Sequence, residues 1–210
     1  MKKVIFERVN HVSFFSRFVG ILLKRILNKR SIKHNERRGA PMAVFGNDWI
    51  GININVDGIY EGEDIEDLFN LLKQIEFNTQ SSTAIDIGAN IGNHSIEFSK
   101  SFKNVICFEP NPRAFDILAA NTKRLNNVQI HNWGCSSSIE KIRLKENFNN
   151  IGESSAAMDV ISNNEIEILV KPLDEMIDSL RNLALIKIDV EGMELSALKG
   201  AEKTISKFHP

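Results

Sequence analysis

The sequence predicts an α/β fold built on a parallel β-sheet. From Thr83 onward, short apolar segments alternate with longer segments of helical periodicity, which is typical of parallel strands joined by helices. The connections between such strands are expected to be right-handed. Glycines and carboxylates come directly after the apolar segments, and open α/β sheets bind ligands at that edge. The pattern therefore predicts a ligand-binding sheet.

Each strand is expected from an apolar run that is broken by polar or turn residues. Helices are predicted to follow the first two strands, at 95–100 and 113–125. Residues 139–144 form a further candidate strand ahead of a polar loop. The four expected strands of the parallel sheet lie at 84–87, 105–108, 128–130 and 184–189.

Residues 41–82 are predicted to form a β-hairpin and a helix ahead of the sheet. At 49–56, isoleucine or valine occupies every second position, which is typical of a strand with one buried face. Turn residues lie on both sides of this strand, at 46–48 and 57–58. Residues 64–72 then show helical spacing with acidic residues near the start.

Residues 1–40 form a basic segment, with 11 Lys or Arg against 2 acidic residues. The rest of the chain is acidic, which argues against nucleic-acid binding by the main fold. An amphipathic helix is predicted at 12–27, too short to span a bilayer, followed by a linker at 28–40. Either this helix packs on the body or on a partner chain, or residues 1–38 contact a membrane surface peripherally.

Composition narrows the class of protein. Hydrophobic residues make up 42% and charged residues 25%, as in globular proteins, so a disordered chain is excluded. Two cysteines, Cys107 and Cys135, are too few for a disulfide scaffold and lack the spacing of a zinc site. We therefore expect a reducing, cytoplasmic location, at the inner face of the membrane if the basic segment binds lipid.

The strongest functional signal lies at 86–92, where the sequence reads DIGANIG. Gly88 and Gly92 allow a sharp turn and a close approach to a ligand. Glu109 ends the second strand, where a carboxylate typically binds ribose hydroxyls. The G-x-G-x-x-G order of dinucleotide-binding loops is missing, and Asp86 suits an amino group rather than a phosphate. S-adenosylmethionine fits these features, and an NAD-dependent oxidoreductase is the alternative.

A second charged group surrounds the last expected strand. Asp189 could contact the cofactor, bind a divalent metal or act as general base on a hydroxyl group. Glu191 is a further catalytic candidate, or it stabilises the start of the next helix. Lys187 is expected to pair with a carboxylate or to reach the sheet edge. His94 and His131 are weaker candidates for the base, because structural roles explain both.

These motifs resemble the FkbM family of S-adenosylmethionine-dependent methyltransferases. The resemblance covers roughly 44–208 and is carried by IDIGANIGNHS at 85–95, CFEPNP at 107–112 and IKIDVEGMELSALKGA at 186–201. It implies a class I, Rossmann-like methyltransferase fold. It also implies O-methyl transfer, often to a sugar hydroxyl in glycan or natural-product pathways, so the expected partner is a small-molecule or glycan acceptor.

The resemblance also implies residue roles. Asp86, Gly88, Asn90 and Gly92 would line the methionine end of the cofactor, and Glu109 would bind its ribose. The full cofactor set is Asp86, Gly88, Ala89, Asn90, Gly92, Asn93, Glu109, Pro110, Gly134 and Asp189, where Gly134 replaces the family's usual alanine near the adenine. The catalytic candidates are Asp189 and Glu191. No metal ligands are assigned, although a divalent metal stays open as a second cofactor.

The sheet of this family has seven strands, and four of them are expected here. We therefore expect the methyltransferase domain at 83–210 to be C-terminally incomplete, with the edge of its fourth strand exposed. Two functions follow: an active methyltransferase, or a cofactor-binding fragment or partner-binding module without catalysis. The polar loop at 149–155 is expected to cover the acceptor site.

Overall fold

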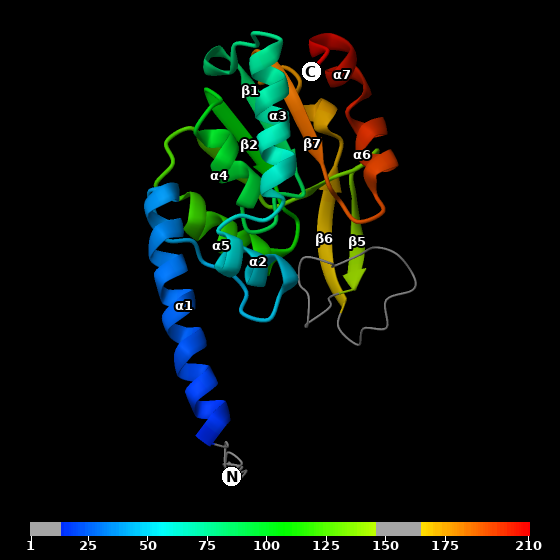
Figure 1. Ribbon diagram of the computed structural model, residues 1–210. Helices are drawn as coiled ribbons and strands as arrows, with labels where there is room; N and C mark the ends of the chain where they lie inside the picture. Colours follow the sequence, from blue (N-terminus) through cyan, green and yellow to red (C-terminus); the bar gives the residue numbers. More distant parts are fainter. Residues whose placement is uncertain (1–13, 146–164) are drawn as a thin grey trace, which may run out of the picture.

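The main sheet has four parallel strands. The computed structural model describes residues 14–145 and 165–210 (Figure 1). The strands follow the order β3-β2-β1-β7 and all pair in parallel. This confirms the four predicted strands and gives a Rossmann-like sheet, in which β7 forms an edge within the described residues. The strands are β1 (Thr83–Ile87), β2 (Asn104–Phe108), β3 (Val128–His131) and β7 (Leu183–Ile188).

Helices cover both faces of the main sheet because successive side chains of a strand point to opposite faces and most of those in β1 and β2 are apolar. Ala84 and Val105 are fully buried in the cluster that α3, α4 and α5 complete. Ile85, Ile106 and Phe108 point to the other face, against η3, α6 and α7. The helices are α3 (Gly62–Gln74), α4 (Asn93–Ser99), α5 (Pro112–Thr122), α6 (Glu194–Gly200) and α7 (Glu202–Phe208), with short 3₁₀ turns η1 (Thr79–Ser81) and η3 (Leu173–Met176).

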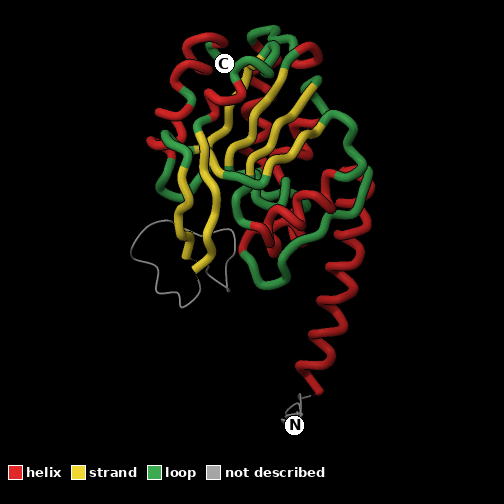
Figure 2. Tube along the Cα trace, turned by 180° about the vertical axis from the view of Figure 1, so that it is seen from behind, coloured by secondary structure: helices red, strands yellow, loops and turns green. Residues whose placement is uncertain are grey.

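A second, three-stranded sheet extends beside the main one (Figure 2). It contains β4 (Gly134–Cys135), β5 (Glu140–Lys145) and β6 (Glu165–Lys171), in the order β4-β6-β5. β5 confirms the candidate strand at 139–144. The sequence reading missed β6, although its alternation of charged and apolar residues carries the strand signal.

The predicted hairpin ahead of the sheet is wrong, because residues 49–56 lie in helix α2 (Trp49–Asp57). Asp48 accepts a hydrogen bond from the Gly51 N–H and caps the helix, and Gly58 ends it with a φ of 90°. Of its nine residues, Gly51 and Ile54 are buried, and they share one helical face. A β-carbon on Gly51 would lie 2.1 Å from the Phe45 carbonyl oxygen, so this close approach requires glycine.

Helix α1 (Phe14–Arg38) is longer than expected. The helical prediction is confirmed over the described part of 12–27, but the linker predicted at 28–40 is wrong, because the helix continues to Arg38. Arg30 and Arg38 donate hydrogen bonds to the carbonyls of Val56 and Gly58 at the end of α2. Cations at a helix C-terminus are electrostatically favourable, and these contacts stabilise the second half of α1 against the body.

None of the helices in the described ranges is long and apolar enough to cross a membrane.

Two asparagines hold the N-terminal segment on the sheet domain. The side chain of Asn121 bonds both backbone groups of Ala43, at 2.7 and 3.0 Å, and also the Ile91 carbonyl at 2.8 Å. The side chain of Asn93 bonds both backbone groups of Tyr60, at 3.0 and 2.8 Å. Residues 43 and 60 flank α2, so these bonds fix that helix relative to the sheet.

A buried ion pair joins the carboxyl halves of β1 and β7. Asp86 is fully buried, and its carboxylate lies 3.2 Å from the Lys187 ammonium, whose side chain is 18% exposed. Ser95 donates a hydrogen bond to the other oxygen of this carboxylate, at 2.6 Å. Burial opposes the charge on Lys187, but Asp86 and Asp189 outweigh it and raise the pKa of the ammonium.

Replacing Lys187 with Met should lower the free energy of unfolding by about 3–5 kcal/mol, because it leaves the buried Asp86 charge without a partner. Urea denaturation followed by circular dichroism measures this. The double variant Asp86→Asn/Lys187→Met should recover part of the loss, since no buried charge remains. The exposed Lys199→Met is the matched control. A Lys187→Met variant within about 0.5 kcal/mol of the control would contradict the prediction.

Candidate functional site

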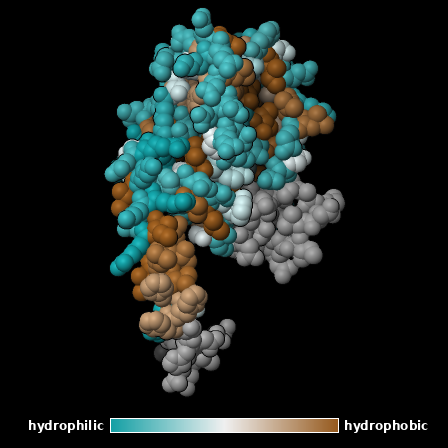
Figure 3. Space-filling model, viewed as in Figure 1, coloured by the Kyte–Doolittle hydropathy of each residue, from teal (hydrophilic) through white to brown (hydrophobic). Residues whose placement is uncertain are grey.

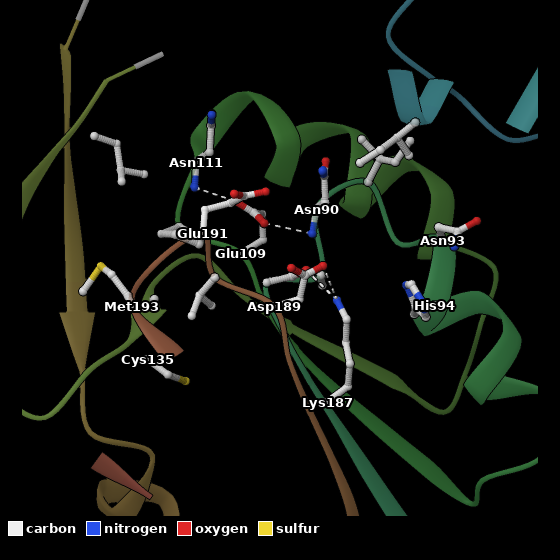
Figure 4. Close-up of a pocket in the computed structure, with 18 of the residues that line it drawn as sticks. Asn90, Asn93, His94, Glu109, Asn111, Cys135, Lys187, Asp189, Glu191 and Met193 are labelled. Atoms are coloured by element: carbon white, nitrogen blue, oxygen red, sulfur yellow. Dashed lines mark hydrogen bonds and ion pairs between the residues drawn. The ribbon is translucent and has the colours of Figure 1, made fainter. Parts of the chain in front are cut away.

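A cleft of about 1250 Å³, its open mouth included, lies at the carboxyl ends of β1, β2 and β7 (Figure 4). Three parts of the chain enclose it: the loops after these strands, the small sheet, and the segment around α2. Its lining residues are Trp49, Ile50, Tyr60, Glu61, Gly88, Ala89, Asn90, Ile91, Asn93, His94, Glu109, Pro110, Asn111, Gly134, Cys135, Leu144, Ile168, Val170, Lys187, Asp189, Val190, Glu191 and Met193.

The loop after β1 is held against both neighbouring strands. The N–H groups of Gly88 and Ala89 donate to the Phe108 carbonyl, at 2.9 and 3.0 Å. Gly88 has a φ of 79°, and a β-carbon there would lie 1.8 Å from the Asp189 carbonyl oxygen. Only glycine fits this backbone conformation and this contact. The sequence predicted a close approach between Gly88 and a ligand. In the structure, Gly88 closely approaches the loop after β7, at the floor of the cleft.

Glu109 connects the loop after β1 with the loop after β2. Its carboxylate accepts hydrogen bonds from the N–H groups of Asn90 and Asn111, each at 2.8 Å (Figure 4). The side chain lines the cleft although the residue is only 7% exposed. Burial raises the pKa of Glu109 to about 7, and the two N–H donors oppose this rise. Each oxygen keeps a lone pair for a further donor.

Asn90 offers a second acceptor next to Glu109. Its φ of 49° places it in the left-handed region, which asparagine tolerates better than most residues. Its side-chain oxygen is buried and accepts no hydrogen bond from the part of the chain that the structure describes. Buried polar atoms normally have a partner, so this oxygen is suited to a ligand that brings an N–H or O–H group.

Lys187 and Asp189 form the charged floor of the cleft. The Lys187 ammonium lies 3.4 Å from the Asp189 carboxylate and donates to the Gly88 carbonyl at 3.1 Å (Figure 4). This confirms that Lys187 pairs with carboxylates. Because the ammonium is shared with the buried Asp86, it only partly neutralises Asp189, whose side chain is 57% exposed. The floor therefore favours a ligand with positive charge.

Two predicted cofactor residues, Asp86 and Gly92, do not line the cleft. The Asp86 side chain points into the domain, toward Ser95 and Lys187, because it lies within β1, upstream of the loop. Gly92 begins α4 with a φ of 91° and packs on Leu118. Both support the loop from behind. The other predicted residues line the cleft: Gly88, Ala89, Asn90, Asn93, Glu109, Pro110, Gly134, Asp189 and Glu191.

The segment before the sheet supplies a wall that the sequence reading missed. Tyr60 and Glu61 line the cleft, and the Glu61 carboxylate lies 3.3 Å from His94 Nε2. Burial lowers the pKa of His94, and Lys187 lowers it further. Burial and Glu61 raise the pKa of Tyr60 to about 12. Glu61 has a φ of 54°, and such strained residues are often found at functional sites.

His131 lies outside the cleft lining. Its ring stacks on Phe108 at 5.1 Å between centroids, which supports the structural role. The loop at 149–155 lies outside the described residues, so the expectation that it covers the acceptor site stays a prediction. The described ranges contain no group of three or more His, Cys, Asp or Glu side chains that could hold a metal ion.

Comparison with known proteins identifies the sheet domain. The family model "Methyltransferase FkbM domain" matches residues 86–210. The chain is also 31% identical over 147 residues to the hexuronic acid methyltransferase AglP of Haloferax volcanii. The match covers 69% of this chain and 59% of AglP, so the chain spans about three-fifths of the length of that relative.

Similar solved structures include the YcgJ protein of Bacillus subtilis, with 20% identity, a TM-score of 0.27, and coverage of 31% of this chain and 29% of that chain. Another is phosphoethanolamine N-methyltransferase 1 of Haemonchus contortus in complex with phosphoethanolamine and S-adenosylhomocysteine. Its sequence identity to this chain is 15% and its TM-score is 0.31, and the match covers 61% of this chain and 25% of that chain.

The family match covers more than half of the chain. It begins at Asp86 and includes Glu109 and Asp189, two of the charged residues that line the cleft. The parallel sheet and its ligand-binding edge agree with a Rossmann-like methyltransferase fold. The chain therefore belongs to the FkbM methyltransferase family.

Proposed function

We propose that the chain binds S-adenosylmethionine in the cleft and transfers its methyl group to a hydroxyl group of a sugar or a similar acceptor, in glycan or natural-product biosynthesis. The observation that carries the proposal is the buried Glu109 carboxylate, which the Asn90 and Asn111 N–H groups hold toward the cleft. A carboxylate at the end of the second strand suits the two hydroxyls of a ribose. The domain proposed for this activity is 83–210.

The other residues of the cleft fit the same cofactor. The unpartnered Asn90 side-chain oxygen and the exposed Asp189 carboxylate offer acceptors for the amino group at the methionine end. Pro110 and Gly134 both line the cleft, and a β-carbon on Gly134 would lie 3.3 Å from the Pro110 ring, so we assign these two residues to an apolar wall for the adenine. When bound, S-adenosylmethionine supplies an electrophilic methyl group on a positively charged sulfur.

A carboxylate in the cleft can take the proton of the acceptor. In the transfer, an oxygen–carbon bond forms to the methyl group, the sulfur–carbon bond breaks, and the hydroxyl proton leaves. Asp189 is our candidate for the base, with Glu191 as the second, because both line the cleft. A sugar acceptor is supported by the relative AglP, whose name describes a hexuronic acid methyltransferase.

Binding of S-adenosylhomocysteine tests the cofactor. Replacing Glu109 with Gln should raise the Kd in isothermal titration calorimetry by roughly 10- to 150-fold, because hydrogen bonds to a charged group contribute about 1.5–3 kcal/mol. The exposed Glu66→Gln is the matched control and should bind as the unchanged chain does. If the unchanged chain binds NAD but not S-adenosylhomocysteine, the oxidoreductase alternative replaces this proposal.

The affinity should also depend on pH. Ribose hydroxyls favour the charged form of Glu109, whose pKa in the unliganded chain is about 7, so the ligand must displace a proton at lower pH. The Kd for S-adenosylhomocysteine should be constant above pH 8. As the pH falls below 7, the Kd should increase by up to about tenfold for each pH unit. Calorimetry in buffers of different ionisation enthalpy measures the proton release. If the Kd of the Glu109→Gln variant depends on pH in the same way, a group other than Glu109 causes the pH dependence.

Methyl transfer tests the reaction itself. With S-adenosylmethionine labelled in the methyl group and a panel of hexuronic acid and neutral hexose glycosides, Asp189→Asn should lower the transfer rate by about 100-fold or more, since it removes the proton acceptor. The exposed Asp178→Asn is the control. Tight S-adenosylhomocysteine binding without transfer to any sugar would support the cofactor-binding module instead.

A further inference from the structure

The N-terminal half of α1 is apolar and exposed. Residues 14–27, named here the apolar end, project away from the body (Figure 1). No residue of α1 is buried, and Phe14, Phe15 and Phe18 are 86%, 72% and 59% exposed. The other exposed large side chains of the apolar end are Ile21, Leu22, Leu23, Ile26 and Leu27. Patches of this kind mark sites of interaction.

The apolar side chains occupy most of the helix circumference. At 100° per residue, Phe14, Phe18 and Leu22 lie on one side, while Leu23 and Leu27 lie on another. A helix surface that is apolar over so wide an arc is normally covered by protein or lipid. Figure 3 shows the apolar end as a continuous hydrophobic surface on the face in view, with hydrophilic residues closer to the body.

Positive charge is concentrated on the same helix. α1 carries eight Lys or Arg side chains and one carboxylate, Glu36. Arg30 and Arg38 contact α2, whereas Lys24, Arg25 and Lys29 are exposed. Basic side chains next to an apolar surface are the combination that binds anionic lipid headgroups.

We propose that α1 binds the surface of an anionic lipid bilayer. The side chains of the apolar end lie at the boundary between headgroups and acyl chains, and the basic side chains contact the headgroup phosphates. Two copies of α1 would bring together two sets of eight basic side chains with one carboxylate each, so charge complementarity favours lipid over a second copy of this chain. The contacts of α1 with α2 involve Arg30, His34 and Arg38 and leave the apolar end accessible.

Vesicle flotation of the full chain tests this proposal. The chain should float with vesicles of equal parts phosphatidylglycerol and phosphatidylcholine at 50 mM NaCl, and the bound fraction should fall at least fivefold at 500 mM NaCl or with pure phosphatidylcholine. Phe15→Ser/Phe18→Ser/Leu22→Ser and Lys24→Glu/Arg25→Glu should each lower the partition coefficient at least tenfold. Circular dichroism verifies that each variant folds.

Matched controls separate a specific surface from general charge or hydrophobicity. Lys123→Glu/Arg124→Glu reverses an identical, exposed pair on the body, and Leu71→Ser removes an exposed leucine of α3; both should float as the unchanged chain does. The proposal is overturned by absent flotation, by salt-independent binding, or by α1 variants that float like the controls. The proposal is also overturned if the chain forms a dimer that does not float with vesicles, because a second copy of the chain would then cover α1.

Discussion

The buried ion pair between Asp86 and Lys187 is the interaction on which the shape of the cleft depends. It joins β1 to β7 inside the domain, and the same ammonium also bonds the Gly88 carbonyl and pairs with Asp189. One cation therefore holds the loop after β1 close to the loop after β7. A buried charge without a partner is destabilising. Loss of either Asp86 or Lys187 would therefore disturb the packing of the loops after β1 and β7.

The charge of the cleft follows from this arrangement. Asp86 has its counter-ion within the protein, so Glu109, Asp189 and Glu191 are the carboxylates that line the cleft in the loops after the strands. On the opposite wall, Glu61 pairs with His94. Since Asn93 holds the backbone of Tyr60, the segment before the sheet is a fixed part of the site rather than a separate extension.

Local sequence signals predicted the sheet domain well and the N-terminal region poorly. The strands of the main sheet are apolar runs of four to six residues that end at turn residues, and this length suits a buried strand better than a helix. In α2, isoleucine at alternate positions favours a strand, and the helix buries only one of these isoleucines, Ile54. Three features stabilise the helix instead: the Asp48 cap, the end at Gly58 and the close approach of Gly51 to Phe45. The close approach depends on packing.

The sequence by itself determined the family-like motifs, the parallel sheet and the acidic residues at its ligand-binding edge, because strand periodicity and glycine positions are local properties. The tertiary structure decided which of these residues line the cleft. Asp86 and Asp189 both follow apolar runs in the sequence, yet one is buried and the other exposed. Burial depends on what packs across the sheet, and the residues that supply that packing are distant in the chain.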